Sequence, residues 1–109
     1  MLTTTEIRIN EKLFATGCAV SNLAAINGAI SQSRLSRALA GQKPLEAEDG
    51  ISLLKTLDEM LELMKTSTIM PNWSKHDRIR DTLRLQREYK EARIKDRISE
   101  LVIEHAPGQ

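Results

Sequence analysis

Apolar side chains recur at helical spacing along most of the chain, most clearly between Glu46 and Lys65. There they repeat every three or four residues, which is the period of one helix face. Acidic residues fill the first turn, where they suit the positive end of a helix dipole. The stripe is wide enough to predict packing partners on two sides. Its members are Ile51, Leu53, Leu54, Leu57, Met60, Leu61, Leu63 and Met64.

A second helix is predicted near the N-terminus. Thr3 and Glu6 have the spacing of a capping box, in which each side chain bonds the other residue's backbone N–H. Ile9 and Leu13, four residues apart, give this helix an apolar face. We expect Phe14, beside them, to lie in the core.

Two short helices joined by a tight turn are predicted between residues 20 and 41. An Asn-Gly dipeptide marks the turn, because both residues tolerate the left-handed backbone conformation. Ser31 is a good N-cap for the second short helix, and Leu35 and Leu39 give it one apolar stripe. Its other side is polar and carries no acid. Such side chains can hydrogen-bond base edges or phosphates in a DNA major groove. They are Gln32, Ser33, Arg34, Ser36 and Arg37.

This stretch resembles the helix-turn-helix of the phage repressor and Cro-like (XRE-type) DNA-binding proteins. The resemblance covers about residues 9–64, and one spacing departs from the family. The apolar anchor of the second helix follows the turn glycine by seven positions, where the family usually has six. Either the turn holds an extra residue, or Ala25 and Ala29 take the family's alanine and glycine positions. The matching residues are Gly17, Leu23-Ala24, Gly28, Ile30-Ser31, Leu35-Ser36 and Gly41.

Charge is distributed unevenly, although the net charge is only +1. Residues 31–43 carry three cations and no acid, whereas residues 44–66 carry six acids against two lysines. The first segment would attract phosphate and its neighbour would not. In related folds the loop after the second helix lies close to the DNA backbone. Gln42 and Lys43 are therefore candidate phosphate contacts, with a plain solvated turn as the alternative.

The C-terminal third reads as a linker followed by a charged helix. Trp73 either pins the linker to the domain or anchors a partner, and we favour the first. Ser74 is predicted to cap a helix that runs to about His105, with nine basic and seven acidic residues between positions 75 and 104. Its apolar register drifts near Leu85 and Tyr89, so one long bent helix and two shorter ones both fit. Its two stripes are Ile79 and Leu83, then Ile94, Ile98, Leu101 and Val102.

Aromatic residues make up only 3% of the chain, so the core must be aliphatic, which favours packed helices over a sheet. The sequence predicts an all-α fold: a compact helix-turn-helix domain of about four helices (residues 1–66), a linker (67–73) and a C-terminal helical extension (74–105). We expect this extension to dimerise or to fold back on the domain. No run is long and apolar enough for a signal peptide or a membrane span, and we expect a cytoplasmic protein.

Residue sets for catalysis, metal binding or cofactor binding are not recognisable in the sequence, and we expect no enzyme activity. Cys18 is the only cysteine, which excludes an internal disulfide and fits a reducing compartment. We expect its thiol to be buried and structural. We expect His76 and His105 to be solvated and not catalytic.

The function predicted from the sequence is a sequence-specific regulator that binds double-stranded DNA. The family resemblance implies a transcriptional repressor, often of phage or mobile-element origin. Arg37 and Gln32 are the expected base contacts, because Arg suits guanine and Gln suits adenine. Ser33 and Ser36 would contact a base or a phosphate, and Arg34 and Lys43 the backbone. A monomer would read only a few base pairs, so we expect a homodimer on a two-fold site.

The alternative is a protein-binding adaptor or inhibitor that keeps a helix-turn-helix shape. The low net charge and the acidic helix predicted at residues 46–65 favour it. Its partner would bind through residues 74–105.

Overall fold

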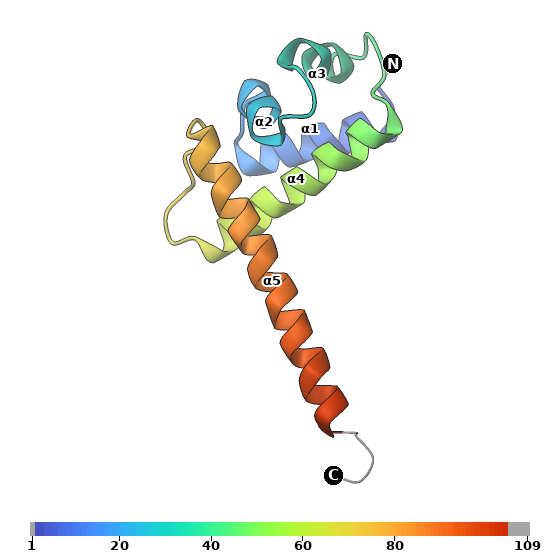
Figure 1. The fold of residues 1–109 in the computed structure, drawn as a ribbon. Coiled ribbons are helices and arrows are strands. Elements are labelled where there is room, and N and C mark those ends of the chain that lie inside the picture. Colours follow the sequence, from blue (N-terminus) through green and yellow to red (C-terminus); the bar gives the residue numbers. More distant parts are fainter. Residues whose placement is uncertain (1, 105–109) are drawn as a thin grey trace.

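The computed structural model describes the backbone of residues 2–104 and the side chains of residues 2–99. These residues form five helices and no strand, so the all-α prediction is confirmed (Figure 1). His105, the tail after it and the side chains of Leu101 and Val102 lie outside the described residues. The helices are α1 (Thr4–Thr16), α2 (Val20–Asn27), α3 (Gln32–Leu39), α4 (Ala47–Thr66) and α5 (His76–Glu104).

One of the two bonds of the predicted capping box opens α1, and a bond between the two side chains replaces the other. The Thr3 hydroxyl accepts a hydrogen bond from the backbone N–H of Glu6, with 3.5 Å between the nitrogen and oxygen atoms, and donates one to the Glu6 carboxylate. Gly17 ends the helix in the left-handed conformation, with φ of 67°, as expected of a glycine at this position. The Glu6 side chain is buried, so this cap also belongs to the interior.

The core is built around the crossing of α1 and α4. Ile9 and Leu13 of α1 face Leu53, Leu57 and Met60 of α4, and all five are buried in one cluster. The other helices pack on this pair, and this cluster of described residues contains one aromatic side chain, Trp73. Its further members are Cys18, Leu23, Ala24, Ile26, Ile30, Leu35, Leu63, Trp73, Ile79 and Leu83.

Gly50 lets α1 and α4 approach closely. It is buried in the first turns of α4, and a Cβ at this position would stand only 2.7 Å from Cγ2 of Thr5. A glycine inside a helix costs about 1 kcal/mol relative to alanine. A glycine is nevertheless required here, because Thr5 of α1 occupies the space that a side chain at position 50 would need.

Two expectations for apolar residues are wrong. Phe14 is 92% exposed and Ile51 is 69% exposed. Phe14 follows the buried position Leu13 by one residue, and Ile51 precedes the buried position Leu53 by two. A helix turns about 100° per residue. Leu13 and Leu53 are buried, so Phe14 and Ile51, about 100° and 200° around their helices, point to solvent. Apolar residues one or two positions apart on a helix cannot all face the core of the domain.

The linker between α4 and α5 is pinned by Trp73, as predicted. Its indole Nε1 donates a hydrogen bond of 2.8 Å to the backbone carbonyl of Thr16, and the side chain is buried. Met70 also lies near the end of α1, with its Cε 3.9 Å from where a Cβ of Gly17 would be. The linker therefore closes over the C-terminal end of α1.

The chain after the linker forms one continuous helix, which decides between the two alternatives. It begins at His76, two residues after the expected cap, because the Ser74 backbone N–H and hydroxyl both bond the side-chain oxygen of Asn72. Ile79 and Leu83 enter the core, whereas the C-terminal half of α5 extends away from the body (Figure 1). The molecule measures 63 × 30 × 20 Å as a result. In the described part of the chain, no helix is both long and apolar enough to cross a membrane.

Gly50→Ala tests the close approach of α1 and α4. We expect it to lower the free energy of unfolding by about 1–3 kcal/mol, the usual cost of overpacking, despite the better helix propensity of alanine. The Thr5→Ser variant removes Cγ2, so the same alanine should cost less in that background. Urea denaturation of the four proteins measures the coupling. Equal losses in both backgrounds would contradict the contact.

Candidate nucleic-acid interface

The turn between α2 and α3 is fixed to α4 by Asn27. Gly28 follows α2 in the left-handed conformation, with φ of 77°. The side-chain oxygen of Asn27 accepts from the backbone N–H of Ala29 at 3.0 Å. Its amide nitrogen donates to the hydroxyls of Ser52 and Thr56, at 3.0 Å each. The Asn-Gly pair is therefore both a turn and an attachment point.

Helix α3 begins at the predicted cap. The Ser31 hydroxyl accepts from the backbone N–H of Arg34, with 3.3 Å between the nitrogen and oxygen atoms. The inner face carries Leu35 and Ala38, which are 0% and 1% exposed. Gly41 adopts the left-handed conformation just after the helix, with φ of 78°, as the sequence predicts. The orientation of α3 about its own axis is thus fixed by burial on one side.

The side of α3 away from the core is polar and open to solvent. All of the side chains singled out from the sequence on this helix are exposed, and none is acidic. They belong to one continuous element, so the structure brings them together on one surface. They are Gln32, Ser33, Arg34, Ser36 and Arg37, with the cap Ser31 also exposed.

Three cations, two on α3 and one in the turn after it, gather around one hollow. Arg34, Arg37 and Lys43 line a small hollow, together with Ala38, Pro44 and Leu45. Lys43 and its neighbour Gln42 are exposed in the turn that follows α3. The Gln42 backbone N–H donates to the Arg37 carbonyl at 2.9 Å, which holds this turn against the helix end. The cluster thus combines side chains from the helix and from the loop.

Asp49 is a neighbour of this surface that the sequence reading missed. Its Oδ2 lies 3.2 Å from Nη2 of Arg34, and the two side chains are 21% and 51% exposed. Although residues 31–43 contain no acid, α4 brings one to their edge. Arg37 and Lys43 form no ion pair within the described residues, so they contribute most of the positive charge there. The partners are fifteen residues apart, on different helices, so no local pattern announces this pair.

His76 differs from its expected solvated state. It is half-buried, and its Nε2 lies 2.8 Å from the side-chain oxygen of Asn22, at the start of α2. This bond joins the first residue of α5 to the helix pair. Among the described residues, no group of three or more His, Cys, Asp or Glu side chains could hold a metal ion.

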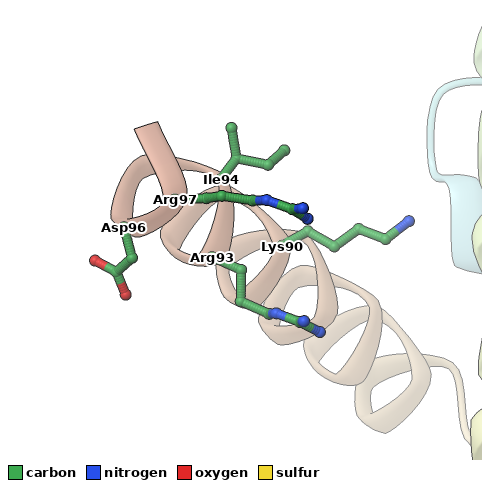
Figure 2. Close-up of a pocket in the computed structure, with 5 residues that line it drawn as sticks. All are labelled: Lys90, Arg93, Ile94, Asp96 and Arg97. Carbon is green, nitrogen blue, oxygen red and sulfur yellow. The ribbon is translucent and has the colours of Figure 1, made fainter. Parts of the chain in front are cut away.

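A second hollow lies on α5 alone (Figure 2), in the half of α5 that extends away from α3 (Figure 1). It is a groove along one helix and not an enclosed cavity. Its residues are Lys90, Arg93, Ile94, Asp96 and Arg97.

The comparisons with protein-family models, with characterised proteins and with solved structures found no match to the chain.

Cys18 is buried, as predicted, and its environment suppresses its reactivity. Burial raises the pKa of the thiol from 9.0 to about 11, although a backbone hydrogen bond with Leu23 acts in the opposite direction. A thiol reacts as its thiolate. A rise of two pKa units lowers the thiolate fraction at pH 8 about a hundredfold.

We therefore expect slow labelling of Cys18 by Ellman's reagent at pH 8 in the folded protein. In 8 M urea, labelling should be at least a hundredfold faster, because the thiol regains its ordinary pKa and its access to reagent. Absorbance at 412 nm measures both rates. Comparable rates in the two conditions would contradict a protected thiol.

Proposed function

We propose that the chain is a regulator that binds double-stranded DNA in a sequence-specific manner, with α3 in the major groove. The single observation that carries this proposal is the polar, acid-free exposed side of α3. A major groove is about 12 Å wide and accepts an α-helix. The opposite side of α3 is fixed in the core by Leu35 and Ala38, so its exposed side chains are presented in a defined orientation.

The roles proposed for these residues follow their chemistry. Arg37 and Gln32 would contact base edges, and Ser33 and Ser36 a base or a phosphate. Arg34, Gln42 and Lys43 would contact the DNA backbone. Asp49 partly neutralises the charge of Arg34. The cations Arg37 and Lys43 would therefore supply more of the attraction to phosphate. Helix α3 and the C-terminal half of α5 lie at different ends of the molecule, so α5 does not cover the exposed side of α3 (Figure 1).

Arg37→Ala tests the DNA-binding surface. A preferred duplex would first be selected from a random library, and its affinity measured by fluorescence anisotropy. We expect this variant to lose about 5- to 150-fold in affinity, since one good base contact contributes about 1–3 kcal/mol. Affinity should also fall steeply with salt.

Arg78→Ala is the matched control. Arg78 is also exposed and cationic but lies on α5. It should bind the selected duplex as the unaltered chain does. Equal losses in the two variants, or no enriched sequence, would contradict the proposal.

The proposed regulator is a transcriptional repressor, and it binds DNA as a homodimer. One α3 would reach only a few base pairs, and two would read half-sites about one helical turn apart. Light scattering should then give twice the 12.3 kDa mass of the chain. A mass of 12.3 kDa at the concentrations that bind DNA would overturn the two-fold part of the proposal.

A second candidate function is a protein-binding adaptor. It is favoured by the C-terminal half of α5, whose described side chains from Arg87 to Ser99 are all exposed. For this function Arg37→Ala should have no effect, whereas changes on α5 should abolish partner binding.

A further inference from the structure

The face by which α5 packs on the domain continues beyond the domain. Ile79, Leu83, Lys90 and Ile94 follow one another at intervals of four, seven and four residues, so they share one side of the helix. Ile98, four residues later, extends it. A helix rises about 1.5 Å per residue, so α5 is about 43 Å long, and only its first half has a neighbour. The second half repeats the pattern with nothing opposite.

The first half shows what this face recognises. Ile79 and Leu83 are buried in the core. Beside them, Arg87 pairs with Glu59 and Lys90 with Glu62, each at 2.6 Å. The Gln86 amide donates to the Glu59 backbone carbonyl at 3.2 Å. The partner in these contacts is α4, an amphipathic helix with carboxylates beside its leucines. Apolar side chains flanked by cations thus pack on an acidic helix.

The second half presents the same chemistry to solvent. Ile94 and Ile98 are 58% and 55% exposed. Lys90, Arg93 and Arg97 extend toward the same side of the helix, whereas Asp96 points the other way (Figure 2). From position 91 to position 99, beyond the cation that pairs with α4, there are three cations and two acids, a local charge of +1.

We propose that this distal face of α5, formed by Arg93, Ile94, Arg97 and Ile98, binds an acidic amphipathic helix of another protein. Its isoleucines would pack on apolar side chains of that helix, and its cations would pair with carboxylates on the flank, as Arg87 and Lys90 pair with α4. In such a contact, each helix places anchoring side chains at intervals of three and four residues along one face. The proposal does not depend on DNA binding by α3.

A second copy of α5 is a poorer occupant. A self-paired coil needs apolar positions sustained over three or four heptads, and Lys90 interrupts this face between Leu83 and Ile94. Opposite an acidic helix, the cations of this face would instead pair with carboxylates, as Arg87 pairs with Glu59.

The test uses the full chain and a fluorescein-labelled peptide with the sequence of residues 47–66, which copies the acidic helix that α5 already packs against. We expect anisotropy to report binding that weakens at least tenfold with Ile94→Ser or Arg97→Glu. A peptide carrying Glu59→Gln and Glu62→Gln should also bind at least tenfold more weakly.

Leu85→Ser and Lys95→Glu are the controls. Leu85 and Ile94 are equally exposed, at 58%, but Leu85 lies about 200° around the helix from Leu83 and so on the other side. Both controls should bind the peptide within twofold of the unaltered chain. No binding of the peptide, or an equal loss with Leu85→Ser, would overturn the proposal. A dimer that Ile94→Ser converts to a monomer would overturn it in favour of a second copy.

Discussion

The structure depends on the contact between α1 and α4. Gly50 sets how near these helices lie, because Thr5 occupies the place of its missing side chain. Around this contact Ile9, Leu53 and Leu57 lose all exposure to solvent. The remaining helices find their positions by packing against the pair. A chain with 3% aromatic residues builds its interior in this way because short aliphatic side chains allow helices to approach closely.

Helix α4 links the two ends of the molecule. Near its start Asp49 reaches Arg34 of α3, and in its first half Ser52 and Thr56 bind the turn before α3. In its second half Glu59 and Glu62 bind α5. One rigid element therefore holds the candidate DNA-binding surface and the base of the projecting helix. Its acidic residues, which give the sequence a locally negative charge, are largely used in pairs with cations of other helices.

Periodicity, caps and glycines were sufficient to predict the helices and most of their ends, because these are local properties. The exposed polar face of α3 was likewise predictable, since Leu35 and Ala38 fix which side is buried. The errors arose where tertiary packing decides. Phe14 is apolar but lies off the buried face of α1. His76 finds Asn22 across 54 residues, and Arg34 finds Asp49 on another helix. No sequence spacing encodes such partners. The DNA-binding role of α3 remains a prediction.

The two halves of α5 differ in what stabilises them. The first half shares the core, whereas the second is held by its own backbone hydrogen bonds and by local contacts such as Arg93 lying 5.8 Å from the centre of the Tyr89 ring. An isolated helix of fewer than about 12–15 residues is marginal in water. Its amide protons should therefore exchange with solvent through local fraying, without global unfolding. Along this single continuous helix, the free energy of opening that permits exchange then falls from that of global unfolding at the N-terminal half to almost zero at the C-terminal end.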